Sequence, residues 1–149
     1  MIYQVRRMRD SDVDAVLALA AVLPTAPHWP REAYLAALDS PMRNVQVAVT
    51  PAGELLGFAV TSMVPPEAEL ESIAVVAVWQ LWGIARHLLQ VLSGELAAAG
   101  VTELLLEVRA SNEAALAAYR ALGFAQTGLR RGYYAHPAED AVQMRRTIP

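Results

Sequence analysis

The chain has 149 residues, which is the size of one compact domain over residues 1–149 and leaves little room for a second. It contains no cysteine, which excludes a disulfide framework, a cysteine-ligated zinc site and a cysteine nucleophile. A formal net charge of −3 argues against a general nucleic-acid binder, and 55% hydrophobic residues exclude a disordered chain.

The first part of the chain is predicted to form a strand and two helices. Residues 2–8 alternate apolar and polar side chains, as a short strand does. Residues 10–12 are Asp-Ser-Asp, which can cap a helix that Pro24 then ends. A second helix is expected from Pro30, which suits a first helical turn, with Tyr34 in its apolar stripe.

Three strands are predicted next, over residues 44–49, 55–64 and 69–76. A Pro-Ala-Gly-Glu turn joins the first two as a hairpin, and two consecutive prolines separate the second from the third. Apolar residues at helical spacing over residues 81–96 then indicate the longest helix of the chain. Gly100 fits the C-terminal cap of this helix.

The last part of the chain continues the alternation of strands and helices. Residues 102–108 are apolar enough for a strand that is buried on both faces. Ser111-Asn112-Glu113 can cap a helix over residues 114–122. Two more strands are expected over residues 124–130 and 141–147, so the whole pattern predicts a mixed α/β layer fold.

Four segments of the second half form a recognisable set, at residues 73–75, 80–85, 106–112 and 118–124. The run Leu-Glu-Val-Arg-Ala-Ser-Asn, followed by Tyr-x-x-Leu-Gly-Phe, is the most specific part. Together these segments resemble the GNAT superfamily of N-acetyltransferases, and more narrowly the bacterial ribosomal-protein-alanine N-acetyltransferases. The resemblance covers nearly the whole chain, since that subfamily is also similar at Trp29 and at residues 130–134 and 139–141.

This resemblance implies a fold, a reaction and two substrates. The implied GNAT fold has a central mixed, mostly antiparallel sheet with a splayed pair of strands, and helices on both faces. Acetyl-CoA is the implied donor of the acetyl group, and a primary amine is the acceptor. The acceptor in this subfamily is typically a protein N-terminus, so a ribosomal protein is one expected partner.

The expected donor site lies where the longest helix begins. A helix N-terminus presents unpaired N–H groups and a positive dipole, which suit the pyrophosphate of coenzyme A. Close relatives carry basic residues at the positions of Leu81 and Trp82, and losing such exposed charges is expected to cost about 0–1 kcal/mol each. Apart from the resemblance, the alternative interpretation of this segment is an ordinary helix start that contains small residues. The resemblance assigns the contact to Leu81, Trp82, Gly83, Ile84, Ala85 and Arg86.

The same resemblance extends the donor site to a strand and to a second helix. Ile73, Ala74 and Val75 would contact the pantetheine arm through their backbones, and an N–H near Val75 would polarise the thioester carbonyl. Asn112 would bond to the same arm, although its position also suits a helix N-cap. Tyr119 on that helix completes the predicted contacts.

Two residues are candidates for moving protons. Glu107 lies between Leu and Val near the end of a strand, where it can act as the general base for the amine. The alternative is an ion pair at the strand end, with Arg109 as a partner. Tyr119 can protonate the leaving thiolate as the general acid, or it can simply pack on the sheet. Glu69 and Glu71 share a face of the neighbouring strand, so either can assist or replace Glu107.

The acceptor side is expected to be lined by aromatic and basic residues. Arg131, Tyr133 and Tyr134 precede the last strand and would form one wall of a peptide groove. Trp29 would form the opposite wall, and Glu71 would reach the amine. The alternative is a solvated basic turn with two packing tyrosines. The three histidines are scattered without ligand spacing, so no metal site is expected.

Three other functions stay open on the sequence alone. The chain can acetylate a small-molecule amine, bind coenzyme A without catalysis, or act as an interaction protein through the apolar pair Leu81-Trp82. No run approaches about 18 apolar residues, and the start of the chain lacks the features of a signal peptide. We therefore expect a cytoplasmic protein without membrane or nucleic-acid contact, as a monomer or weak dimer.

Overall fold

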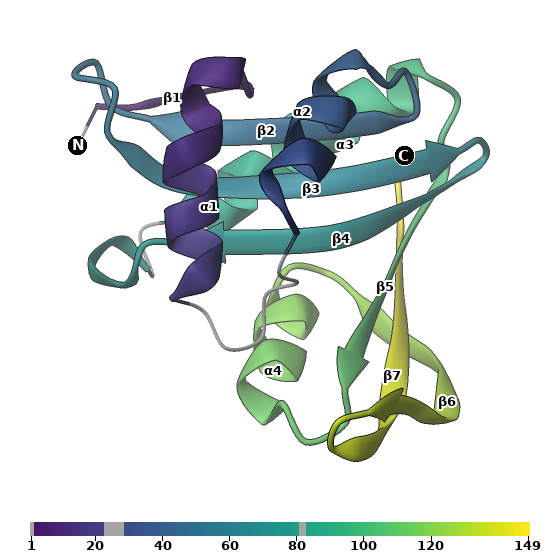
Figure 1. The fold of residues 1–149 in the computed structure, drawn as a ribbon. Helices are drawn as coiled ribbons and strands as arrows, with labels where there is room; N and C mark the ends of the chain where they lie inside the picture. Colours follow the sequence, from purple (N-terminus) through teal and green to yellow (C-terminus); the bar gives the residue numbers. More distant parts are fainter. Residues whose placement is uncertain (1, 23–28, 81–82) are drawn as a thin grey trace.

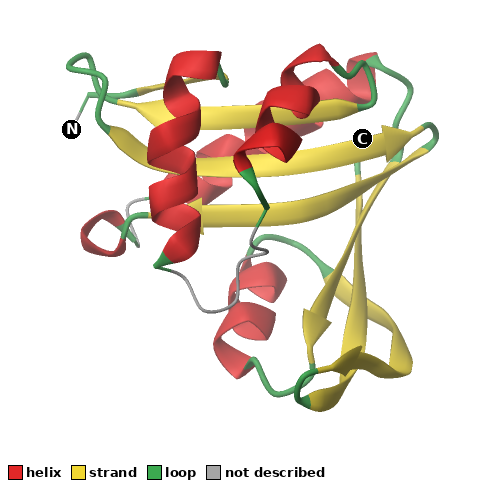
Figure 2. Cartoon of the chain, in the orientation of Figure 1, coloured by secondary structure: helices red, strands yellow, loops and turns green. Residues whose placement is uncertain are grey.

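A computed structural model describes residues 2–22, 29–80 and 83–149 of the chain (Figure 1). Within these ranges the strands are β1 (Gln4–Arg7), β2 (Arg43–Val49), β3 (Leu55–Val64), β4 (Glu67–Val75), β5 (Glu103–Arg109), β6 (Ala125–Ala135) and β7 (Ala138–Thr147). The α-helices are α1 (Val13–Ala21), α2 (Arg31–Asp39), α3 (Ile84–Ala98) and α4 (Glu113–Ala121), and a short 3₁₀ turn precedes both α1 and α3 (Figure 2). The strands and α-helices follow one another in the predicted order.

The strands form one mixed sheet that is mostly antiparallel. Its order is β1-β2-β3-β4-β5-β7-β6, and among the described strand pairs β4–β5 is the one that runs parallel. Parallel neighbours need a crossover connection, and α3 lies in the segment that joins these two strands. The predicted mixed α/β sheet is therefore confirmed.

Helices cover both faces of this sheet (Figure 1). The helices α1 and α2 lie on one face, where their apolar residues share a core with Val45 of β2 and Phe58 of β3. The other core contains Leu88 of α3, Leu116 of α4 and Leu104 of β5. Because side chains alternate along a strand, each face of the sheet receives a different set of residues.

The helix α3 shows how the sequence determines local structure. Its buried residues Ile84, Leu88, Leu92 and Leu96 recur every four positions, which places them in one stripe that faces the sheet. The helix ends just before Gly100, whose φ of 89° is the left-handed conformation that often follows a helix. Neither α3 nor another described helix is long and apolar enough to cross a membrane.

Two predicted boundaries near the end of the chain are wrong. The strand expected over residues 124–130 extends to Ala135, and the last strand begins at Ala138 rather than at residue 141. Tyr133 and Tyr134 therefore lie within β6 and not in a turn before the last strand. The apolar pattern missed this extension because β6 is an edge strand that is exposed at nearly every position.

Two local expectations are also corrected. The strand β5 is not buried on both faces, because Leu104, Leu106 and Val108 are buried while the residues between them are half-buried. This alternation arises because one face of β5 packs against the core and the other lines an opening in the sheet. Pro30 precedes α2 as its N-cap and does not lie in its first turn.

Candidate active site

The sheet opens between its two parallel strands. β4 and β5 pair over three residues each, and the pairing ends at Glu69 and Leu105. Beyond this point β4 stays paired with β3, and β5 stays paired with β7, so the two strands diverge (Figure 1). The predicted splayed pair is confirmed. It forms a fork between residues 70–75 of β4 and residues 106–109 of β5.

Backbone donors of β4 point into this fork. The N–H of Val76 donates to the carbonyl of Leu56 on β3, at 2.8 Å. Hydrogen bonds alternate in direction along an antiparallel strand, so the N–H groups of Ile73 and Val75 face away from β3 and into the fork. The side chains of these two residues pack in the core beside α3, whereas Ala74 belongs to the core on the other face.

Two carboxylates of β4 project from one face of the fork, next to a bulge in the strand. The register of β3 and β4 shifts at Glu71, which is the extra residue of the bulge. Leu70 before the bulge and Ile73 after it both pack in the core beside α3. Glu69 and Glu71 therefore project from the opposite face, which also carries α1 and α2, as the period of two predicts.

An arginine holds the carboxylate of Glu71. The Nε and Nη2 atoms of Arg43 donate to its two oxygens at 3.2 and 3.3 Å. The same guanidinium stacks on the ring of Trp29, 4.8 Å from the centroid. Trp29 in turn contacts the buried ring of Tyr34, with 5.1 Å between centroids. Glu71 and Trp29 thus lie together on the α1–α2 side of the fork, and Glu71 already has a cationic partner.

Glu107 projects from β5 on the same face as Glu69 and Glu71, because its neighbours Leu106 and Val108 are buried on the other face. Its Oε1 lies 3.5 Å from Nη2 of Arg130 on β6. The Arg109 partner considered from the sequence is therefore replaced by Arg130. Within the described chain, the buried Oε2 of Glu107 has no hydrogen-bond partner. A buried acceptor without a partner is costly, so this oxygen is suited to accept a hydrogen bond or a proton from a ligand.

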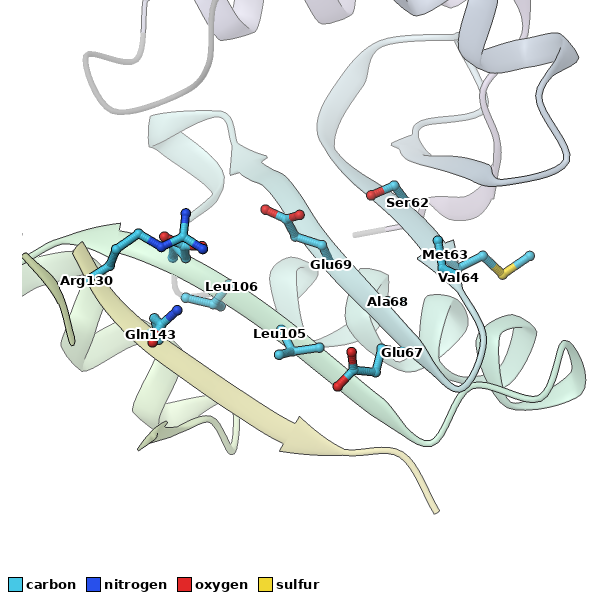
Figure 3. Close-up of a pocket in the computed structure, with 11 residues that line it drawn as sticks. Ser62, Met63, Val64, Glu67, Ala68, Glu69, Leu105, Leu106, Arg130 and Gln143 are labelled. Atoms are coloured by element: carbon cyan, nitrogen blue, oxygen red, sulfur yellow. The ribbon is translucent and has the colours of Figure 1, made fainter. Parts of the chain in front are cut away.

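A cavity of ≈ 380 Å³ lies at the base of the fork (Figure 3). Glu69, Glu107 and Arg130 line it, together with apolar residues of β3, β4 and β5. Burial raises the pKa of Glu69, and the charges of Glu71 and Glu107 raise it further. Glu69 and Glu107 thus line one cavity, in which Glu69 keeps part of its surface exposed to solvent.

Tyr119 approaches the fork from the opposite face. It lies on α4, half-buried, and its ring packs edge-on against Phe124 with 5.8 Å between centroids. Burial raises the pKa of Tyr119, and the neighbouring Tyr134 adds to this effect. The phenol therefore stays protonated at neutral pH, as a proton donor must. The packed ring that the sequence offered as an alternative is present, and it also orients the hydroxyl.

The two tyrosines predicted for the acceptor side lie on β6. Tyr133 and Tyr134 pack edge to face, with 5.1 Å between ring centroids. Arg130 stacks on Tyr133 at 4.6 Å, and Arg109 stacks on Tyr134 at 4.2 Å. Burial raises the pKa of Tyr134. Arg131, by contrast, is exposed to solvent.

A clamp that sequence reasoning missed holds the β6–β7 turn. Arg109 donates to the carbonyls of His136 and Pro137 at 3.1 Å each, and to Oε1 of Glu139 at 3.2 Å. The other oxygen of Glu139 accepts from the N–H of Ser111 at 2.6 Å, and these bonds lower the pKa of Glu139. The clamp ties the turn to the end of β5 and the start of α4. The one signal in the sequence was the similarity of residues 139–141 to the subfamily, and this similarity did not indicate what Glu139 does.

The predicted donor site begins at a left-handed glycine. Gly83 has a φ of +79° and caps α3, whose first residue is Ile84. The N–H of His87 bonds to the carbonyl of Gly83 at 3.0 Å, as the first full turn of an α-helix requires. The N–H groups of Ile84, Ala85 and Arg86 precede this bond, so they have no intrahelical partner and can bind an anion.

Other residues predicted for the donor site have structural contacts as well. The side chain of Arg86 donates to the carbonyl of Ala121 at 2.9 Å, which ties α3 to the end of α4. The Oδ1 atom of Asn112 accepts from the N–H of Ala115 at 3.1 Å, so Asn112 is the N-cap of α4 and its amide nitrogen points elsewhere. The pair Leu81-Trp82 lies outside the described residues.

The histidines and acidic residues form no metal-binding group in the part of the chain that the structure describes. Nδ1 of His87 lies 2.9 Å from the hydroxyl of Tyr3, and the two rings pack edge to face at 5.4 Å. His87 is therefore a packing residue.

Known proteins are similar to this chain in sequence and in fold. The family model described as the acetyltransferase (GNAT) family matches residues 10–124. Ribosomal protein bS18-alanine N-acetyltransferase of Escherichia coli (strain K12) is 44% identical over 104 residues, which cover 68% of this chain and 70% of that relative. N-alpha-acetyltransferase RimI of Mycobacterium tuberculosis (strain ATCC 25618 / H37Rv) is 43% identical over 122 residues, or 79% of this chain and 75% of that relative. The crystal structure of the ribosomal-protein-S18-alanine N-acetyltransferase from Escherichia coli matches with a TM-score of 0.83 and 33% identity, covering 99% of this chain and 94% of the other.

Proposed function

Because this chain belongs to the GNAT family of acetyltransferases, we propose that it transfers an acetyl group from acetyl-CoA directly to the α-amine of a protein N-terminus. Its N-acetyltransferase activity follows from the family and from its relatives. Those relatives are named for an alanine of ribosomal protein bS18 and for N-terminal α-amines. The N-terminus of a ribosomal protein is therefore the acceptor that we propose first.

One observation carries this proposal: the fork has a carboxylate on one face and a phenol on the other. Glu107 faces the side of α1 and α2, with a buried oxygen that lacks a partner among the described residues. Tyr119 packs in the core on the side of α3 and α4. An amine that enters from the first side would meet a thioester that enters from the second, which is the alignment that direct transfer needs.

The amine has to lose a proton before it attacks the thioester carbonyl. A protein α-amine has an ordinary pKa of about 7.7–8.0, so roughly a tenth of it is neutral at pH 7. Glu107 accepts the proton from the remainder, directly or through a water molecule. Its ion pair with Arg130 fixes the direction of the carboxylate.

The sulfur that leaves the acetyl group has to gain a proton. Tyr119 is the donor, and proton transfer from a phenol of pKa near 10 to a thiolate of pKa near 8.5 is uphill by about 2 kcal/mol or more. That cost is tolerable when the phenol is held against the sulfur. The N–H of Val75, which faces the fork, would polarise the thioester carbonyl as the amine attacks.

Acetyl-CoA supplies the acetyl group as an activated thioester, and the residues present fit it. Unpaired N–H groups in the first turn of α3 suit its pyrophosphate, and the left-handed Gly83 leaves the approach free of a side chain. The N–H groups of Ile73 and Val75 suit the amides of the pantetheine arm, which would lie along β4 as an added strand. The free amide nitrogen of Asn112 would donate to the same arm.

Two measurements test the donor and the acceptor separately. Acetyl-CoA at a hundredfold excess over its Kd should stabilise the protein by about 2.7 kcal/mol, which raises the Tm by roughly 5–11 °C. Release of free thiol should then be measured with peptides that have a free N-terminus, with the same peptides already acetylated, and with small polyamines. Thiol release with the free peptides alone supports the proposal. Release with polyamines alone would show that the acceptor is a small amine and not a protein N-terminus.

A pair of variants tests the role of Glu107. Glu107→Gln should lower kcat by about 10²–10⁴-fold, the usual contribution of a general base, without lowering the Tm shift caused by acetyl-CoA. Glu32→Gln, at an exposed position of α2, is the matched control and should leave kcat unchanged. Equal kcat values for the two variants would remove Glu107 from the mechanism.

A further inference from the structure

We propose that the cavity at the base of the fork is a subsite for a positively charged side chain near the start of the acceptor peptide, and that Glu69 is the residue that selects it. This inference rests on the proposed function, because the cavity is taken to hold the peptide whose α-amine lies at Glu107.

The cavity lies where the acceptor peptide has to pass. Glu107 is part of its lining, so a peptide whose amine reaches Glu107 has its first side chains beside the cavity. Glu69 and Leu105, the last paired residues of β4 and β5, also line it. Its volume of ≈ 380 Å³ is far more than the methyl group of an N-terminal alanine can fill. A longer side chain from the following residues is therefore needed to fill it.

The wall of the cavity suits a side chain with an aliphatic stem. Met63, Ala68 and Leu105 line it, and Val64 at its edge is 78% exposed (Figure 3). Arginine and lysine bury their methylene groups against apolar surface of this kind while their charged ends reach a polar group. The remaining question is which polar group receives the charged end.

The charges of the cavity leave one carboxylate available. Three carboxylates line it, from Glu67, Glu69 and Glu107, against the single guanidinium of Arg130. Glu107 lies 3.5 Å from Arg130, and Glu67 lies 3.4 Å from Arg145. Over the described ranges Glu69 makes no ion pair. Glu69 is thus the negative charge of the cavity that a ligand can neutralise.

The surroundings of Glu69 favour a cationic ligand. Burial and the charges of Glu71 and Glu107 raise its pKa, and Arg130 and Arg43 oppose them only in part. A guanidinium or ammonium group beside Glu69 would offset these effects and form a charge-assisted hydrogen bond. An acidic side chain would instead meet several carboxylates.

Peptides that differ only in charge test this subsite. Each peptide begins with alanine and carries arginine at position two, three or four, and its control carries citrulline, which has nearly the same shape without the charge. Acetyl transfer is followed by thiol release at saturating acetyl-CoA. At one of these positions we expect arginine to be favoured over citrulline by about tenfold or more in kcat/KM, as one charge-assisted hydrogen bond provides.

Variants then assign the preference to Glu69. Glu69→Gln should bring the arginine-to-citrulline ratio close to one, and Glu69→Arg should invert it. Glu54→Gln, at an exposed position outside the cavity, is the matched control and should keep the wild-type ratio. A ratio that survives in Glu69→Gln overturns the assignment to Glu69.

The wild-type protein separates failure of the subsite from failure of the proposed function. If the peptides are acetylated with ratios near one at all three positions, the subsite is wrong and the proposed function stands. If acetyl-CoA raises the Tm but no peptide is acetylated, the proposed acceptor and the subsite fail together.

Discussion

The two glycines at the start and in the middle of α3 should respond to alanine in opposite directions. Gly83 precedes the helix with a φ of +79°, whereas Gly94 lies within the helix at an exposed position. Among the described residues, an added Cβ would meet no heavy atom within 4 Å at either position. Steric contact with neighbouring residues therefore affects neither substitution. Backbone conformation alone determines whether alanine raises or lowers the free energy of unfolding.

The size of each effect follows from that conformation. A left-handed backbone costs a non-glycine residue about 1–2 kcal/mol, and the stiffer unfolded chain returns about 0.4–1 kcal/mol. Gly83→Ala should thus lower the free energy of unfolding by roughly 1 kcal/mol, which is about 2–4 °C in Tm for a domain of this size. Gly94→Ala should raise the free energy of unfolding by about 0.5–1 kcal/mol, because alanine is the better helix former.

Urea denaturation of the wild type and both variants measures these changes, and calorimetric titration measures acetyl-CoA binding. Gly83 determines how the free N–H groups of Ile84 and Ala85 are presented, so Gly83→Ala should also weaken acetyl-CoA binding. Gly94→Ala should leave that Kd unchanged. If Gly83→Ala raises the urea midpoint as Gly94→Ala does, the left-handed start of α3 and the anion site built on it are refuted.

Three further predictions concern the proton-moving residues and the clamp. Tyr119→Phe keeps the ring against Phe124, so we expect a change in unfolding free energy within about 0.5 kcal/mol but a loss in kcat of about 10²-fold or more, in denaturation and steady-state assays. Folding raises the pKa of Glu69, so its ionised form destabilises the folded state as pH rises above the ordinary range of a glutamate. Glu69→Gln should accordingly melt above the wild type at pH 7 and together with it near pH 3. Glu139→Ala should release the β6–β7 turn, which predicts a higher KM for peptides and faster amide exchange at Tyr134.

Buried elements could be predicted from the sequence because burial leaves a periodic pattern. The stripe from Ile84 to Leu96 and the alternation in β2 both report contact with the core, and both elements were found in order. The edge strand β6 has no buried face, so its second half produced no such pattern. Tyr133 and Tyr134 therefore lie outside the predicted strands, although they belong to β6.

The ion-pair partners of Glu107 and Arg109 could not be predicted, because they depend on how the strands are arranged in the sheet. Glu107 and Arg109 are close in sequence, but they point to different partners once β6 and β7 are in place. Arg130 comes from β6 to meet Glu107, and Glu139 comes from β7 to meet Arg109. Local spacing contains neither contact, and the resemblance supplied the residues without their pairing.

The glutamates around the fork differ in whether an arginine pairs with them. Each of the three glutamates near Glu69 has an arginine two strands away in the sheet: Arg43 for Glu71, Arg130 for Glu107 and Arg145 for Glu67. A base needs a fixed direction, and an ion pair provides it, while a recognition site needs a charge that the protein itself leaves uncompensated. Glu107 meets the first requirement and Glu69 the second. The proposed base and the proposed selecting residue thus differ in their ion-pair partners, although both line one cavity.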